Sequence, residues 1–100
     1  MKNSNDMNQV FILRCDWNIW GDTGHDIVGA YSSYESACRD LKVFVDNEKR
    51  TSLEIYFTNG VINSNVGIED YEDKDNYFQF YTTDGEWFIE VYIECISIKD

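Results

Sequence analysis

Residues 33–48 read SYESACRDLKVFVDNE, and this stretch decides the fold because here the hydrophobic period changes from two to about 3.6. Charged side chains such as Arg39 and Lys42 separate the apolar ones. The apolar side chains recur at steps of three and four residues, at Tyr34, Ala37, Cys38, Leu41, Phe44 and Val45. That spacing places them on one face of an amphipathic helix. We therefore predict one helix, at about residues 33–48.

Both ends of this helix carry residues that stabilise helix ends. Ser32-Ser33-Tyr34-Glu35 supplies a capping box, in which the Ser32 hydroxyl accepts a hydrogen bond from a backbone N–H and Glu35 reaches back. Lys49 and Arg50 follow the last turn, where positive charge suits the negative end of the helix dipole.

Outside the helix, apolar residues alternate with polar ones, which is typical of half-buried strands. Before the helix we expect strands at 10–17 and 26–31, joined by a loop with two glycines at 18–25. After it we expect strands at 53–58, 61–66, 77–82 and 86–98. Asn59-Gly60 and Asp84-Gly85 mark tight hairpin turns, because these residue types tolerate a positive φ.

This element order, ββαββββ, predicts an α+β fold with an antiparallel sheet. The sheet has one apolar side to bury, and the single amphipathic helix is available to pack on that face. The chain has 100 residues, which is too few for two independent cores. We expect residues 1–8 to be a flexible N-terminus and residues 9–100 to be a single domain.

Charge is unevenly distributed along the chain. The formal net charge is -11, and residues 51–100 hold 11 acids against the bases Lys74 and Lys99. Direct binding to nucleic acid or to an anionic membrane requires a basic surface, and this sequence has none. The acidic second half instead points to a protein partner with a basic surface.

The cysteines indicate a reducing compartment. Cys15, Cys38 and Cys95 are odd in number and widely spaced, whereas a small secreted scaffold has a denser and even set. We expect all three to be small buried hydrophobic residues. The first residues contain no apolar run that would indicate a secretory signal, so a cytoplasmic protein is expected.

The strongest candidate site is an acidic loop at residues 67–76. Five acids fall within seven residues there, and tyrosines alternate with acids along the second half of the chain. Negative charge attracts a basic groove, while rigid aromatic rings provide contact area at a low entropy cost. The predicted partner-binding residues are Glu69, Asp70, Tyr71, Glu72, Asp73, Asp75 and Tyr77.

An alternative site is the loop from Trp17 to Asp26. Trp20, Asp22 and His25 cluster there, so a ligand-binding or catalytic site is the second hypothesis, with His25 near Asp22 and Asp26. The sequence has no phosphate-binding loop, nucleophile elbow or zinc-ligand spacing. We therefore predict a protein that is not an enzyme and has no cofactor or metal. A homodimer paired through an edge strand is a further option, because the chain contains no proline to block an edge.

Two resemblances bear on origin. Residues 26–37, DIVGAYSSYESA, resemble small uncharacterised bacterial and phage domains in which a strand with an aromatic-Ser-Ser step runs into a helix. This resemblance covers residues 10 to about 48 and implies a β-hairpin followed by a helix, with no catalytic residues. In size, acidity and tyrosine-rich strands, the chain is similar to phage-encoded inhibitors of nucleic-acid enzymes, such as anti-CRISPR proteins and other DNA mimics.

Overall fold

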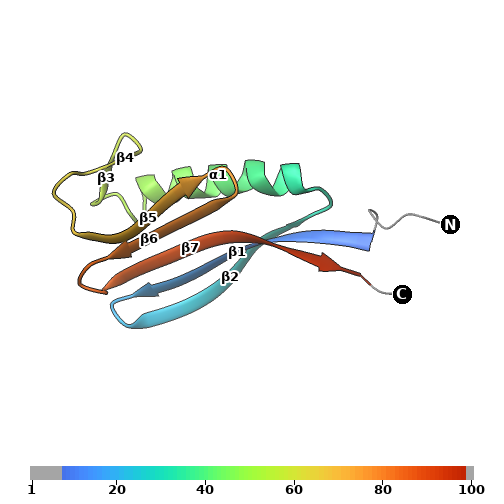
Figure 1. Cartoon of the computed structure of the whole chain (residues 1–100), viewed down its shortest axis with the longest axis horizontal. Coiled ribbons are helices and arrows are strands. Elements are labelled where there is room, and N and C mark those ends of the chain that lie inside the picture. The colour runs from blue at the N-terminus through green and yellow to red at the C-terminus, as the bar shows by residue number, and fades with distance from the viewer. Residues whose placement is uncertain (1–7, 99–100) are drawn as a thin grey trace.

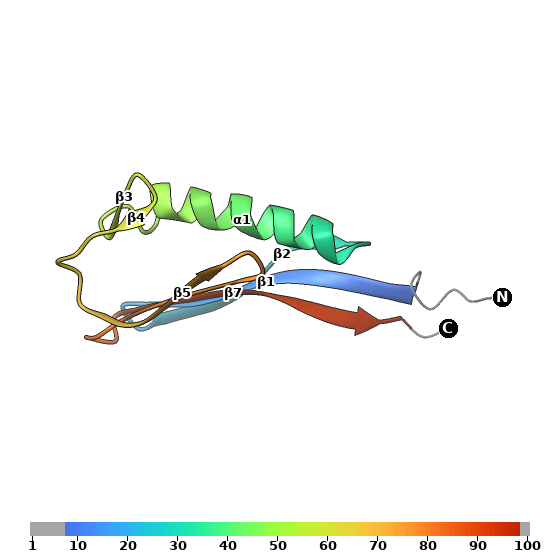
Figure 2. The same ribbon diagram turned by 45° about the horizontal axis from the view of Figure 1, so that its top comes forward.

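Helix α1 (Tyr34–Arg50) lies across one face of a five-stranded antiparallel sheet (Figures 1 and 2). The computed structural model describes residues 8–98. Across the sheet the strands follow the order β2 (Asp22–Tyr31), β1 (Gln9–Ile19), β7 (Trp87–Ser97), β6 (Tyr77–Thr82) and β5 (Ile68–Lys74). The expected α+β class, with one helix packed on an antiparallel sheet, is confirmed.

The central pair of strands, β1 and β7, determines which side chains meet the helix. Leu13 and Cys15 of β1 lie opposite Ile93 and Val91 of β7, and all four are on the helix side of the sheet. Leu13 and Val91 are completely buried there, together with Phe78 and Phe80 of β6. The alternate residues of these strands point to the other side, which we call the open face. It includes Arg14, Asp16, Tyr77, Gln79, Glu90 and Tyr92.

The helix buries the face that the sequence predicts, and it begins and ends slightly later than expected. Ala37, Leu41 and Val45 are buried against the sheet. The N-cap is Ser33, whose hydroxyl accepts from the Ser36 backbone N–H at 3.2 Å. The prediction of Ser32 as the capping residue was wrong, because the chain is still extended at Ser33, with φ -134° and ψ 148°.

The segment after the helix differs most from expectation. Residues 51–56 form turns rather than a strand, and only β3 (Phe57–Thr58) and β4 (Val61–Ile62) pair, as a separate two-stranded sheet. The backbone N–H of Leu53 donates to the Glu48 carbonyl at 2.8 Å, which folds the chain back so that Leu53 is completely buried. The turn at Asn59-Gly60 is confirmed, with φ values of 52° and 80°.

Two predicted loops are strands instead. Residues 18–25 continue β1 and β2, and only Trp20 and Gly21 form the turn between them. Residues 68–74 form the edge strand β5, which pairs with β6, so the predicted acidic loop at 67–76 was wrong. An edge strand tolerates this charge density because its open face and its outer rim both contact water.

The cysteine prediction holds in part. Cys15 is buried, Cys38 is half-buried and Cys95 is exposed near the end of β7, so Cys95 is not a core residue. The predicted flexible N-terminus lies outside the described residues except for Asn8. In the described part of the chain, no helix has the length and apolar character needed to cross a membrane.

Candidate functional site

The seven predicted partner-binding residues do not form one surface. Asp70, Glu72 and Tyr77 lie on the open face, in register with Tyr81, Gln79 and Tyr92 of neighbouring strands. Tyr71 and Asp73 point to the helix side, opposite Phe80 and Phe78. Glu69 lies at the register shift of β5, and Asp75 lies in the turn before β6. The alternation of β5 thus separates residues that are adjacent in sequence.

Tyr71 is part of the packing between β5 and the core. Its ring lies 6.0 Å from Phe57 and 6.1 Å from Phe78, between ring centroids. Burial and then the neighbouring carboxylate of Asp73 raise the pKa of the Tyr71 phenol to about 12. Tyr71 is therefore held inside the fold rather than offered to a partner.

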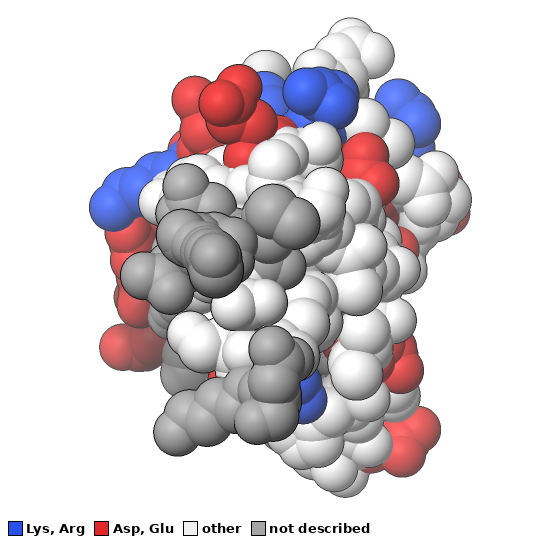
Figure 3. All heavy atoms as spheres, turned by 90° about the vertical axis from the view of Figure 1, so that its right-hand side faces the viewer, with Lys and Arg blue, Asp and Glu red and all other residues white. Residues whose placement is uncertain are grey.

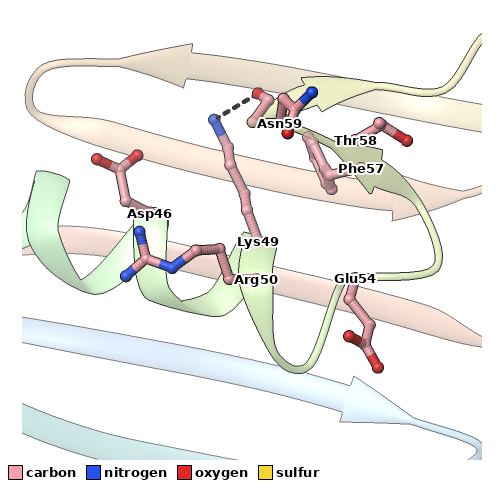
Figure 4. A pocket seen from close by; sticks show the side chains of 8 residues that line it. Asp46, Lys49, Arg50, Glu54, Phe57, Thr58 and Asn59 are labelled. Carbon is pink, nitrogen blue, oxygen red and sulfur yellow. Dashed lines mark hydrogen bonds between the residues drawn. The ribbon is translucent and has the colours of Figure 1, made fainter.

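Asp73 is held by a buried lysine. Lys49, in the last turn of α1, is 8% exposed, and its Nζ lies 2.5 Å from the Asp73 carboxylate. Lys49 also donates to the Gly60 carbonyl at 3.5 Å, the contact drawn in Figure 4. Lys49 and Gly60 line a hollow of about 650 Å³, which Asp46, Arg50 and Glu54 also line (Figure 4). Opposite charges line this hollow, so it has no clear preference for an anion or a cation.

On the open face, side chains of neighbouring strands are linked to one another. Tyr77 donates to Glu90 at 2.6 Å, and Tyr92 donates to Asp16 at 3.0 Å. Gln79 donates to Asp70 at 2.8 Å. Burial, followed by these carboxylate contacts, raises the pKa of both Tyr77 and Tyr92, so the phenols remain hydrogen-bond donors. Further ion pairs join Arg14 to Glu94 and Lys74 to Glu72. Most carboxylates of the open face therefore already have partners.

His25 has a different partner from the one expected. Its Nδ1 lies 2.9 Å from Oδ1 of Asp16, the residue opposite it on β1. The predicted pairing with Asp22 or Asp26 was wrong, because alternation along β2 places those two side chains on the helix side of the sheet. His25 is an open-face residue, and its side chain is 74% exposed.

Trp20 is the most unusual residue of the alternative site. It forms the β1–β2 turn with Gly21, and both have positive φ, 56° and 84°, the pattern of a type I′ turn. Asn, Asp and Gly are favoured at such positions, and a bulky side chain there is strained. Trp20 is nevertheless 65% exposed, so packing does not compensate for the strain. Strain at an exposed aromatic residue marks a functional candidate.

The β6–β7 turn adjoins the turn that carries Trp20, and it contains two acidic residues. The Trp20 backbone N–H donates to the Glu86 carbonyl at 2.8 Å, which places the β1–β2 turn against the β6–β7 turn. Asp84 accepts from the Thr82 hydroxyl at 2.6 Å and from the Glu86 N–H at 2.9 Å. These two hydrogen bonds lower the pKa of Asp84 and keep it ionised.

We call Trp20 and the carboxylates of Asp22, Asp84 and Glu86 the sheet tip. Within residues 8–98, none of these three carboxylates has an ion-pair partner. The tip lies at the end of the sheet remote from both chain termini (Figure 1). Trp20 and Asp22 belong to the alternative site predicted from the sequence, whereas Asp84 and Glu86 were not predicted. The sequence does contain a signal for this turn, because Trp20-Gly21 lies between two alternating runs. A large aromatic residue is unusual at such a turn position.

The reactivity of Cys15 and the grouping of metal-binding side chains follow from the same geometry. Burial, and then the carboxylates of Glu48, Asp26 and Asp16, raise the pKa of the Cys15 thiol to about 12, so it is not a nucleophile at neutral pH. In the described part of the chain, no three His, Cys, Asp or Glu side chains are grouped so that they could hold a metal ion.

Comparison with known proteins returned no matching family model, no matching curated protein and no matching solved structure.

Proposed function

We propose that this protein is a non-enzymatic binding protein that occupies a basic, nucleic-acid-binding surface of another protein, with the sheet tip as its anchor. The observation that carries the proposal is Trp20, which is 65% exposed at a strained turn position, in a pair of adjoining turns whose acidic residues have no ion-pair partner within residues 8–98. Exposed tryptophan is among the residues that most often dominate binding energy at protein interfaces.

The chemistry of the tip favours a basic partner. An arginine or lysine of the partner gains from stacking on the indole of Trp20 and from the charge of the carboxylates around it. The net charge of -11 steers such a partner from a distance and repels nucleic acid itself. The tip then acts at short range, while the whole-molecule charge accelerates the encounter.

The open face extends this surface away from the tip. Tyr81 and Phe88 form an edge-to-face pair there, with ring centroids 5.6 Å apart, and Phe88 lies opposite Asn18, two residues before Trp20. Beyond them lie the tyrosines and carboxylates linked across the strands. Acidic groups interleaved with aromatic rings can imitate a nucleic-acid strand in a basic groove.

The proposal extends to the biological role and the compartment. Small size, acidity and tyrosine-rich strands are features of phage-encoded inhibitors, so inhibition of a nucleic-acid-binding effector, in an anti-defence or anti-CRISPR role, is the process that we propose. The thiols of Cys15, Cys38 and Cys95 are free, which supports action in the cytoplasm.

Replacement of Trp20 by asparagine tests the proposal. Asparagine is favoured in a type I′ turn, so Trp20→Asn removes the indole without weakening the hairpin. The wild-type chain is expected to capture a protein from host lysate at low salt, to release it at moderate salt, and to lose it to added DNA. The variant should bind the captured protein at least about tenfold more weakly, as expected for an interface hot spot.

Val43→Ala is the matched control, because Val43 is 63% exposed on the helix, away from the tip. It should bind like the wild type. Equal binding by Trp20→Asn would contradict the role of the tip. Captured proteins that neither salt nor DNA releases would contradict a basic, nucleic-acid-binding partner.

A further inference from the structure

A second concave site, separate from the sheet tip, lies between the C-terminal half of α1 and the sheet. It is a cavity of about 270 Å³. The residues that give it its chemical character are Trp17, Ile19, Asp26, Phe44, Glu48 and Trp87. Two indoles and a phenyl ring thus face a small space that also contains two carboxylates.

The two carboxylates are free of basic partners. No ion pair within residues 8–98 involves Asp26 or Glu48, although the Trp17 Nε1 donates to Asp26 at 3.1 Å. Cys15 also lines the cavity. Burial is the largest cause of the raised pKa of its thiol, and both carboxylates raise this pKa further. The cavity therefore has a negative potential within apolar walls.

Trp87 adds a hydrogen-bond donor with no acceptor. Its Nε1 is buried and has no hydrogen-bond partner among the described residues. Buried donors are nearly always paired, and Trp87 also lines the cavity, so its indole is a residue of the wall whose donor still lacks an acceptor.

The position of Trp17 is set by the backbone beneath it. Trp17 lies opposite Gly24 of β2, and a Cβ added at Gly24 would overlap the Trp17 ring. The indole therefore lies directly on the β2 backbone, and its Nε1 is tied to Asp26. This wall of the cavity is built by three residues from two strands and does not depend on a flexible loop.

We propose that this cavity binds a small organic cation of the choline type, an alkylated ammonium group with an oxygen acceptor close to it. A metal ion or a primary ammonium group would lose strong hydration against apolar walls, whereas an alkylated ammonium is weakly hydrated. Aromatic rings attract such a cation through their faces, and the carboxylates add charge attraction. When the Trp87 ring turns toward the cavity, its N–H donates to the ligand oxygen.

Nuclear magnetic resonance of the indole N–H groups tests this site directly. The chain contains three tryptophans, and exposed Trp20 lies outside the cavity as an internal reference. Titration with choline should shift the Trp17 and Trp87 signals in a saturable manner and leave Trp20 unchanged. 3,3-Dimethylbutan-1-ol has the same shape as choline without the charge. It should bind at least about tenfold more weakly, because cation–π attraction and attraction to the carboxylates are both lost.

Two variants add a charge control. Glu48→Gln removes a cavity carboxylate and should weaken choline binding by about threefold to tenfold, whereas Glu69→Gln removes an exposed carboxylate on β5 and should not. Equal shifts from choline and its neutral analogue would overturn the proposal, as would equal shifts at all three indoles or no saturable shift. Free trimethyllysine is a second probe, and tighter binding of it than of choline would identify a methylated lysine side chain as the source of the cation.

Discussion

Lys49 places an ammonium group inside the core at the end of the helix. Its Nζ lies 5.3 Å from the centroid of Phe57 and 5.8 Å from that of Phe78, and Asp73 supplies the opposite charge at 2.5 Å. A buried cation must be paired, so this contact fixes both the helix end and β5. At the scale of the residue, an aspartate that the sequence suggests for partner binding also forms an ion pair that joins two elements of the fold.

Asp73→Asn and Lys49→Met should differ in their effect on stability. Asp73→Asn leaves the Lys49 ammonium buried without its counter-charge and should lower the free energy of unfolding by about 2 kcal/mol, between the values typical of exposed and buried pairs. Lys49→Met removes the charge and keeps an apolar chain between the two rings, so it should cost about 1 kcal/mol or less. Urea denaturation measures both. A larger loss for Lys49→Met than for Asp73→Asn would show that the lysine is more than a buried charge.

At the scale of the element, the spacing of apolar residues predicts the helix and strands that bury one regular face. Helix α1 and the strands β1, β6 and β7 were found to within a few residues, because each packs one side against the core. Residues 53–56 alternate like a strand and yet form turns, since burial of Leu53 beneath the helix end outweighs the local pattern. The edge strand β5 was missed because charges on both of its sides resemble a loop.

The candidate sites show a similar limit. The two glycines in residues 18–25 suggested a loop, but Gly24 lies within a strand because the Trp17 ring covers it. Trp20 and Asp22 were found from local composition alone. Asp84 and Glu86 were not, since their turn adjoins that of Trp20 only through the pairing of β1 with β7, which links residues far apart in sequence.

The start of the helix offers a paired test of the cap. Ser33 accepts from the Ser36 N–H, so Ser33→Ala should lower the free energy of unfolding by about 1 kcal/mol, a typical cost for loss of an N-cap. Ser32 is exposed and precedes the cap, so Ser32→Ala should change it by less than about 0.5 kcal/mol. Urea denaturation of the two variants distinguishes them. A reversed order of the two losses would place the cap at Ser32.

At the scale of the whole molecule, the excess of negative charge lies outside the helix. The helix balances four bases, Arg39, Lys42, Lys49 and Arg50, with four acids, Glu35, Asp40, Asp46 and Glu48, whereas acids outnumber bases on the strands and turns. Seen from the end that carries the chain termini, basic side chains lie mostly on the helix side (Figure 3). Several tyrosine phenols donate hydrogen bonds to carboxylates of neighbouring elements. Their protons are part of the folded structure.

The folded protein should therefore lose stability in alkali. Burial first, and then hydrogen bonds to Asp40 and Asp73, raise the pKa values of Tyr31 and Tyr71 from 10.0 to about 12, and the pKa of Tyr77 is raised in the same direction. The stabilisation is complete below pH 10, where phenols of the folded and unfolded chains are both protonated. Between pH 10 and pH 12 the unfolded chain binds fewer protons than the folded chain, so the free energy of unfolding falls as pH rises. Urea denaturation across this range, followed together with tyrosinate absorbance, should show the loss of structure and the release of phenol protons in one transition. Tyr31→Phe removes one of these protons and should make the decline of the free energy of unfolding with pH shallower. If the phenols titrate while the chain keeps its full stability to pH 12, the proposed link between phenol protonation and stability is contradicted.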